Sequence, residues 1–245
     1  MKFLKHCLCA MALSQFAIAA DIEYEQRGAN LWSYLSVHNG IPSNGLILET
    51  SNSVIVIDTP WNDENTAELL QWIHATIGKP VETVIVTHSH EDRSGGAKLL
   101  SDRGISLIGH ELTKAIVKRE QGVDLEAVVS KESPIYTTKE FEIFFPGPGH
   151  TRDNTVVWLP KQKVLHGGCA FKSASTFAIG YIKESDIIEW PKSIRAVDQR
   201  YPNADLYVPG HGPPADRATI DNTLKILENY IDANHGAACK ACINE

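Results

Sequence analysis

The stretch Thr87-His88-Ser89-His90-Glu91-Asp92-Arg93-Ser94-Gly95-Gly96 decides how this chain is organised. It follows an apolar run, Val84-Ile85-Val86, and precedes a helical pattern that begins at Ala97. His88, His90 and Asp92 share parity, so their side chains lie on one side of the chain, about 6.6 Å apart, wherever the backbone stays extended. Two imidazoles and a carboxylate suit zinc or iron, and the two glycines allow a sharp turn beside a metal. An isolated His-x-His also occurs in solvated loops, so other residues must decide between the two interpretations.

The composition is that of an ordinary globular protein. The chain has 245 residues, of which 43% are hydrophobic and 22% charged, and a formal net charge of −7. This length allows one large domain, or two repeated halves that share a core. An acidic chain without a basic run is not expected to bind nucleic acid. We expect a monomer.

The N-terminus has the pattern of a secretory signal peptide. Lys2 and Lys5 precede an apolar run that ends in Ala17-Ile18-Ala19, a small-x-small cleavage pattern. We therefore expect a signal peptide at residues 1–19, a single domain at residues 20–245 and a periplasmic location. A membrane anchor is disfavoured because the run is short and contains polar residues, and no later stretch is long enough to span a bilayer. Loss of the two lysines would move the net charge to about −9.

Three cysteines would remain after cleavage, namely Cys169, Cys239 and Cys242. Export implies an oxidising compartment, in which a free thiol is at risk. Cys239 and Cys242 are close enough in sequence to pair, although the sequence leaves open whether they do. Cys169 needs protection, which a metal would provide.

The hydrophobic pattern predicts strands grouped ahead of helices, twice over, and therefore an α/β (α+β) fold of two packed sheets flanked by helices. The predicted strands are 30–37, 44–49, 53–58, 81–86, 106–108, 140–145, 155–159, 163–165 and 205–208. The predicted helices span about 62–77, 94–103, 111–120 and 216–234, and a further helix begins at Pro191.

Three later loops each place a metal-capable residue beside glycine. They are Gly147-Pro148-Gly149-His150, Gly167-Gly168-Cys169 and Pro209-Gly210-His211-Gly212, and each follows a predicted strand. Sites in mixed α/β folds gather at the carboxyl ends of strands, so we expect these loops to meet. Six candidates are too many for one catalytic zinc, which takes three protein ligands, whereas two metals account for all of them.

This arrangement resembles the class B metallo-β-lactamases of subclass B1 over about residues 22–235. The matching motifs are 88–93, 146–154, 167–173 and 209–212. The resemblance implies a four-layer αββα sandwich of two similar halves and two zinc ions per chain. It places the first zinc on His88, His90 and His150, and the second on Asp92, Cys169 and His211. It also implies that a zinc-bound hydroxide, oriented by Asp92 as a catalytic residue, hydrolyses penicillins, cephalosporins and carbapenems and confers antibiotic resistance.

The same resemblance suggests further roles around the metals. Lys172 matches a position whose cation pairs with the substrate carboxylate, Trp61 aligns with an aromatic pocket wall, and Tyr181 either donates a hydrogen bond or lines the groove. Arg93, Asp58 and Asp153 are expected to hold the ligand loops. His38 is expected at the edge of the site, whereas His74, His110, His166 and His235 are expected to be ordinary surface or core residues.

Two other functions are compatible with the residues. Tyr181 and the short segment 37–42 depart from the family pattern, so a hydrolase of the same fold that acts on a lactone or a thioester is the main alternative. Arg93 directly after Asp92, together with Cys169 on the later loop, favours the lactamase. A zinc-storage protein is disfavoured because storage would be expected to close the coordination that these ligand sets leave open.

Overall fold

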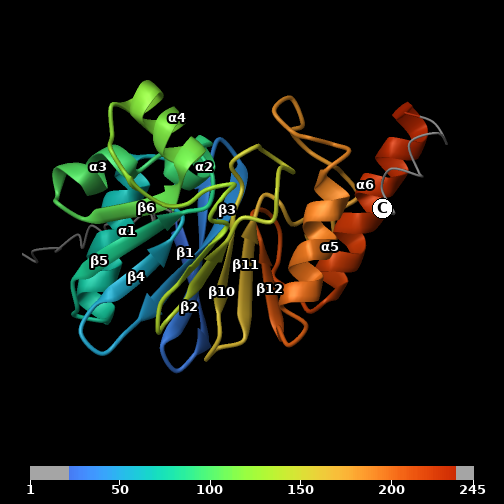
Figure 1. The fold of residues 1–245 in the computed structure, drawn as a ribbon. Helices are drawn as coiled ribbons and strands as arrows, with labels where there is room; N and C mark the ends of the chain where they lie inside the picture. The colour runs from blue at the N-terminus through green and yellow to red at the C-terminus, as the bar shows by residue number, and fades with distance from the viewer. Residues whose placement is uncertain (1–21, 236–245) are drawn as a thin grey trace, which may run out of the picture.

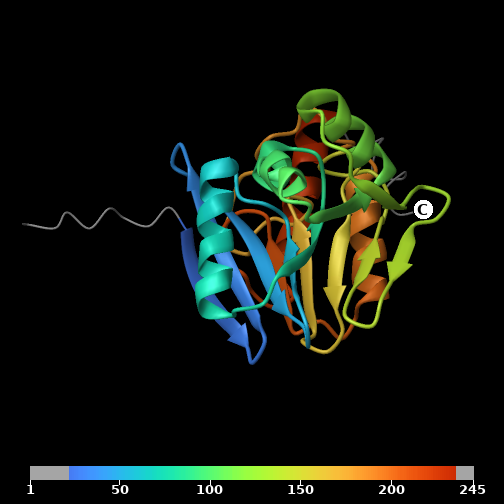
Figure 2. The same ribbon diagram turned by 90° about the vertical axis from the view of Figure 1, so that its left-hand side faces the viewer.

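Two β-sheets lie face to face at the centre of the protein, and helices cover both outer faces. The computed structural model describes residues 22–235. Figures 1 and 2 show the four layers, with α1 (Asp63–Thr76), α3 (Ala97–Asp102) and α4 (Glu111–Gln121) on one side and α5 (Trp190–Arg200) and α6 (Ala218–His235) on the other. The predicted αββα sandwich is confirmed. The expected signal peptide and the Cys239/Cys242 pair lie outside the described residues.

The first sheet comes from the first half of the chain. It has seven strands in the spatial order of the sequence, antiparallel from β1 to β4 and parallel from β4 to β7. The strands are β1 (Ile22–Gly28), β2 (Leu31–His38), β3 (Ile41–Glu49), β4 (Val54–Ile57), β5 (Val81–Val86), β6 (Ser106–His110) and β7 (Glu126–Val129).

The second sheet comes from the second half of the chain and has five strands in the order β12-β11-β10-β9-β8. The strands are β8 (Ile135–Thr137), β9 (Glu142–Phe144), β10 (Val156–Leu159), β11 (Val164–Gly168) and β12 (Leu206–Pro209). Only β11 and β12 run parallel. As a result, the ends of β11 and β12, the end of β9 and the start of β10 all lie at one edge of this sheet.

Three hydrophobic clusters correspond to the three interfaces between the four layers. The central cluster joins the sheets, for example through Leu46 and Ile57 of the first and Val157 and Val208 of the second. A second cluster packs the helices of the first half on their sheet, and a third does the same for α5 and α6. Because both faces of each sheet are buried, the central strands are continuous apolar runs rather than alternating ones.

Helix boundaries follow local signals in the sequence. The Asn62 side chain caps α1 by accepting a hydrogen bond from the Asn65 N–H at 2.8 Å, which is a common start signal. Pro191 lies in the first turn of α5, where a missing N–H costs nothing. Among residues 22–235, no helix is both long and apolar enough to cross a bilayer.

The predicted helix over 94–103 is wrong at its start, because the helical part of the chain begins earlier and is divided into α2 (Glu91–Ser94) and α3. The division falls at Gly95 and Gly96, where the backbone passes close to the start of α1. A Cβ on Gly95 would lie 2.0 Å from the Trp61 carbonyl oxygen, and one on Gly96 would lie 2.0 Å from Thr66 Oγ1. The sequence pattern also missed β1, β7 and β8, which are largely exposed.

Candidate metal centre

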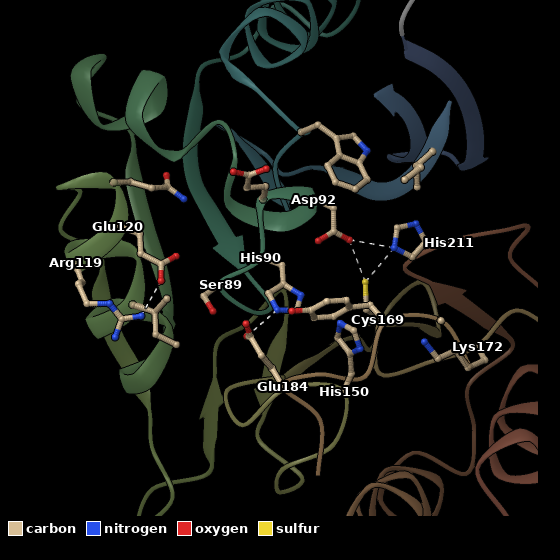
Figure 3. Close-up of a pocket in the computed structure, with 17 residues that line it drawn as sticks. Ser89, His90, Asp92, Arg119, Glu120, His150, Cys169, Lys172, Glu184 and His211 are labelled. Carbon is tan, nitrogen blue, oxygen red and sulfur yellow. Dashed lines mark hydrogen bonds and ion pairs between the residues drawn. The ribbon is translucent and has the colours of Figure 1, made fainter. Parts of the chain in front are cut away.

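The six candidate ligands converge at one edge of the two sheets. His88 follows β5, His150 lies between β9 and β10, Cys169 follows β11 and His211 follows β12. Five of the six, all but the buried His88, line a pocket of about 770 Å³, which Figure 3 shows. The prediction that these separate loops meet is therefore confirmed.

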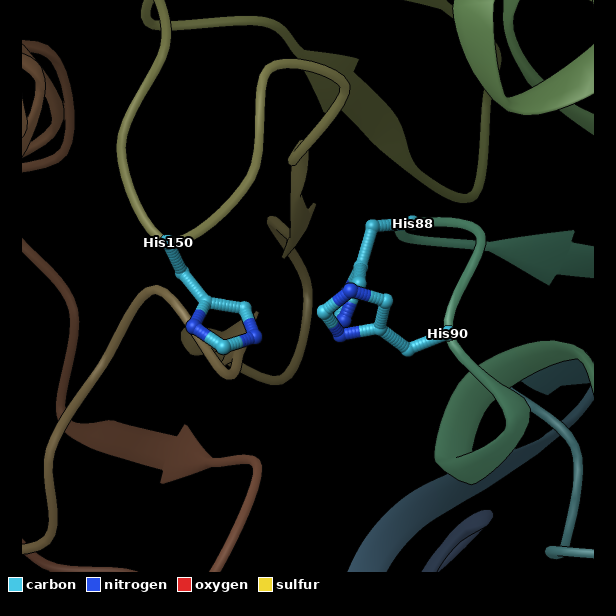
Figure 4. A group of neighbouring side chains, drawn as sticks. All are labelled: His88, His90 and His150. Carbon is cyan, nitrogen blue, oxygen red and sulfur yellow. The ribbon is translucent and has the colours of Figure 1, made fainter. Parts of the chain in front are cut away.

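Three imidazoles form one group, shown in Figure 4. The ring centroids of His88 and His90 are 4.8 Å apart, those of His88 and His150 are 5.1 Å apart, and those of His90 and His150 are 5.2 Å apart. One nitrogen from each ring lies within 4.8 Å of those of the other two. The rings meet edge to face, so they point nitrogen atoms at a common centre rather than stacking.

Asp92, Cys169 and His211 form a second group beside the first (Figure 3). Cys169 Sγ lies 3.1 Å from Asp92 Oδ2 and 3.4 Å from His211 Nε2, and His211 Nε2 lies 3.1 Å from Asp92 Oδ2. A nitrogen of His88 also lies within 4.8 Å of donor atoms of Asp92 and Cys169. The two groups are therefore adjacent, and His88 lies next to both.

The parity expected for His88, His90 and Asp92 holds only in part. The chain is extended at His90, which caps α2, but Asp92 lies inside that helical turn. The turn places the Asp92 carboxylate between the two groups, with Oδ1 4.0 Å from His88 Nε2 and Oδ2 3.1 Å from Cys169 Sγ. This change of backbone conformation therefore brings Asp92 to the second group of ligands.

The donor atoms fit metal ions. Both nitrogens of His88 and Nδ1 of His150 are buried, and none has a hydrogen-bond partner among the described residues. Buried polar atoms nearly always have partners, and a neutral imidazole keeps a lone pair on one of its two nitrogens, so each of these rings can offer one nitrogen to a cation. Burial lowers the pKa of His150 to about 4, so this imidazole is neutral, as a metal ligand must be.

The second group favours positive charge. Burial alone would raise the pKa of the Cys169 thiol, but Arg93 and His211 outweigh burial and hold that pKa well below its usual range. Burial opposes a charge on His211 as well, yet Cys169 and Asp92 raise its pKa to about 10. The negative charges of Cys169 and Asp92 that stabilise the protonated His211 would equally stabilise a bound divalent cation.

Two contacts that the sequence analysis missed orient the ligand imidazoles. His211 Nδ1 donates to the Pro42 carbonyl at 2.6 Å, which leaves Nε2 facing Cys169. His90 Nε2 lies 3.0 Å from Glu184 Oε2, as the dashed line in Figure 3 shows. Hydrogen bonds on the far nitrogen fix the ring orientation of metal-binding histidines.

Arg93 and Asp58 form a fully buried pair behind the second group. Arg93 Nη2 lies 3.0 Å from Asp92 Oδ2 and 3.4 Å from Cys169 Sγ, and Nη1 lies 3.4 Å from Asp58 Oδ2. Gly210 allows this close approach, because a Cβ there would lie 2.6 Å from Cys169 Sγ and 2.7 Å from Arg93 Nη2.

Asp153 is buried behind the imidazole group. Its Oδ2 accepts hydrogen bonds from the Ser89 N–H at 2.9 Å and from Thr113 Oγ1 at 2.8 Å. Asp153 therefore connects the His-x-His loop to α4.

The three predicted substrate contacts all line the pocket. Lys172 is largely buried, with Nζ 4.9 Å from the centre of the Trp190 ring, and burial lowers its pKa. The Tyr181 ring lies 5.5 Å from that of His90, and the Trp61 ring lies 6.3 Å from that of His211.

The segment 37–42 is a tight turn between β2 and β3. Asn39 and Gly40 adopt φ values of 50° and 75°, as a two-residue hairpin turn requires. His38 lies behind Trp61, with 5.9 Å between the rings, and is not among the residues that line the pocket. Instead, Ile41 of the same hairpin lines the pocket.

Comparisons with known proteins agree with this geometry. The family model of the metallo-β-lactamase superfamily matches residues 38–211. The type 2 metallo-β-lactamase of Bacillus cereus is 40% identical over 215 residues, which cover 84% of this chain and 83% of that protein. The type 2 enzyme of Elizabethkingia meningoseptica is 32% identical and covers 86% of each chain.

Solved structures give the same result. The crystal structure of the DIM-1 metallo-β-lactamase has a TM-score of 0.80 and 33% identity, and covers 86% of this chain and 98% of that one. The structure of FIM-1 from Pseudomonas aeruginosa in a mono-zinc form has a TM-score of 0.79 and 30% identity, and covers 85% and 96%. By sequence, by fold and by its two groups of metal-binding side chains, the chain belongs to the metallo-β-lactamase superfamily, among the class B enzymes of type 2.

Proposed function

We propose that this protein is a di-zinc β-lactamase that hydrolyses the amide bond of the β-lactam ring. The observation that carries the proposal is the pair of three-ligand groups at the floor of one pocket, with a buried lysine on its wall. A catalytic metal needs an open position for water and substrate, and a pocket directly over the ligands provides it.

Each zinc would be held by residues from both halves of the chain. His88, His90 and His150 would hold the first, and Asp92, Cys169 and His211 the second. Bound zinc lowers the pKa of water toward neutrality and polarises a carbonyl oxygen.

The protein's own side chains would bind and orient the substrate. Asp92 lies at the pocket floor, where its carboxylate can accept a hydrogen bond from the attacking water and orient it. Lys172 would pair with the carboxylate of the substrate, since its cation lies in a largely buried position where a charge pair is weakly screened. Tyr181 would donate a hydrogen bond from its hydroxyl or line the groove, and Trp61 would form an apolar wall beside His211.

Three buried charges would hold the ligand loops in place. Arg93 supports Asp92 and Cys169 directly, and Asp58 in turn supports Arg93. Asp153 accepts a hydrogen bond from the backbone of the His-x-His loop at Ser89. These residues would keep the ligands in place before metal binds.

The substrate class follows from the relatives, whose names describe them as metallo-β-lactamases. We propose penicillins, cephalosporins and carbapenems as substrates, and antibiotic resistance as the consequence for the host. Export to the periplasm by the segment 1–19 is part of the proposal, because that is where β-lactams meet their targets.

The test is hydrolysis by the purified mature chain with and without zinc. We expect two zinc per chain, hydrolysis of a carbapenem and a cephalosporin, and loss of both activities with a chelator. Cys169→Ser should bind the second zinc much more weakly while keeping the first. Zinc-loaded protein that leaves every β-lactam intact would refute the proposal, and faster hydrolysis of a thioester or lactone in parallel assays would favour the alternative.

A further inference from the structure

His166 is a buried polar residue that the proposed mechanism does not use. It lies on β11, opposite Val157 of β10 and Val208 of β12, and its side chain is fully buried. Its Nε2 lies 2.7 Å from Asp58 Oδ2, whereas its Nδ1 has no hydrogen-bond partner among residues 22–235. A buried imidazole with a single polar contact is held at a cost, so that contact deserves a physical explanation.

The contact is made to the carboxylate that holds Arg93. Asp58 Oδ1 accepts hydrogen bonds from the backbone N–H and the hydroxyl of Thr87, at 2.8 and 2.7 Å. Asp58 Oδ2 has two neighbours, His166 Nε2 at 2.7 Å and Arg93 Nη1 at 3.4 Å. The imidazole therefore makes the shorter bond, and the guanidinium lies at the limit of hydrogen bonding.

The longer Arg93–Asp58 distance matters because the other end of the guanidinium faces the metal ligands. Arg93 Nη2 donates to the Gly210 carbonyl at 2.7 Å, and lies 3.0 Å from Asp92 Oδ2 and 3.4 Å from Cys169 Sγ. A rigid guanidinium that moved toward Asp58 would move away from Asp92 and Cys169. An N–H donor on Asp58 Oδ2 removes the need for that movement, since the buried oxygen is already satisfied.

We propose that His166 is a positioning residue for the second metal. By donating to Asp58 Oδ2, it keeps Arg93 against Asp92 and Cys169, and so holds these two ligands in the geometry that binds the ion. This inference rests on the proposed di-zinc centre, and it assigns a role to a histidine that the sequence analysis grouped with ordinary core residues.

Substitutions at residue 166 separate this role from simple packing. His166→Leu removes the donor and keeps an apolar fit. His166→Gln places an amide N–H the same number of bonds from Cβ as Nε2, whereas His166→Asn provides an amide that is too short to reach Asp58. His110→Asn is the matched control, because His110 is equally buried in the first sheet and accepts a hydrogen bond from the Leu112 N–H at 3.0 Å, which asparagine can also do.

The measurement is metal binding rather than hydrolysis. Cobalt(II) titration reports the second site through the thiolate-to-metal absorption of Cys169, and competition with a chromophoric chelator gives the two zinc affinities. We expect the leucine and asparagine variants to bind the second metal about tenfold to a hundredfold more weakly. The first site should be unchanged, and the glutamine and His110 variants should match the wild type.

Equal second-site affinity in all variants would overturn the inference, and so would an equal loss at both metals or an equal loss with leucine and glutamine. If His166→Leu does not fold, the comparison of asparagine with glutamine decides the question. A wild-type chain without the thiolate absorption would refute the di-zinc centre together with this inference, whereas a wild type that has it and an indistinguishable leucine variant would refute the inference alone.

Discussion

Arg93 offers the most direct test of how the buried charges stabilise this protein. Its side chain is fully buried and lies between two carboxylates and a thiol. It also donates to two backbone carbonyls, those of Asn44 and Gly210. Substitution by methionine keeps an unbranched, apolar stem that reaches about as far as Nε, and removes the charge and all of these donors.

The expected loss of stability is large. Removing one partner of a buried ion pair costs about 3–5 kcal/mol, because the remaining charge stays buried without compensation. The lost carbonyl contacts fall within the same range, since the contributions overlap and are not additive. A domain has about 5–15 kcal/mol in total, so Arg93→Met should be folded but severely destabilised. The loss should be smaller with zinc bound, because a cation offsets the charges of Asp92 and Cys169.

Urea unfolding followed by tryptophan fluorescence measures this loss, with and without a chelator. Arg119→Met is the matched control, since the Arg119 side chain is 69% exposed and its exposed ion pair should contribute about 0–1 kcal/mol. The stability lost by Arg93→Lys should fall between those of these two variants, because one ammonium group cannot contact both Asp58 and Asp92. The reasoning is refuted if Arg93→Met loses no more stability than Arg119→Met.

Three further predictions concern the pocket, an ion pair remote from it and the hairpin turn. Lys172→Ala should lower kcat/KM for carboxylate-bearing β-lactams about tenfold to a hundredfold, because a charge-assisted hydrogen bond to the substrate is lost. Steady-state rates measure this loss, and Lys172→Arg should recover part of the lost kcat/KM. Burial would raise the pKa of Glu142, but hydrogen bonds from Arg200 and Tyr201 lower it, so its contribution to stability is present above about pH 4.3 and is lost as the pH falls through the lower folded value. Glu142→Gln should therefore flatten the acid limb of a plot of unfolding free energy against pH, and an unchanged slope would contradict this. Gly40→Ala should lower the free energy of unfolding by about 1–2 kcal/mol, as measured by urea unfolding, because an L-residue is strained at the φ of 75°. No neighbouring atom lies within 4 Å of the added Cβ, so this cost comes from the backbone and not from a clash. An unchanged stability would show that the turn relaxes.

Much of the fold was predictable because its signals are local. The strand 81–86 was predicted with its observed bounds, since a run rich in β-branched residues between Pro80 and the polar His-x-His loop has few other interpretations. The hairpin turn at Asn39-Gly40 likewise follows from two residues that tolerate positive φ. The strands β1, β7 and β8 were missed because they are largely exposed and lie at the edges of their sheets, where the hydrophobic pattern is weak.

The six ligands could be predicted from their residue types and from the glycines in their loops. The orientation of their side chains could not be predicted. Pro42 orients His211 from 169 residues away, and Glu184 contacts His90 from 94 residues away. No local pattern encodes such pairs, because a backbone carbonyl carries no sequence signature and a glutamate on a loop resembles any solvated charge. The helical turn at Asp92 was hidden for a related reason, since strand parity cannot indicate where a strand ends.

Neither half of this chain contains a complete metal site. The seven-stranded half provides two imidazoles to the first ion and one carboxylate to the second, and the five-stranded half provides the remaining donors. Each complete metal site therefore forms only after the two sheets have packed together. Metal binding is then a late step in folding, and it does not nucleate folding. Once captured, each ion links the two halves, so a chelator should speed their separation more than it disturbs either sheet.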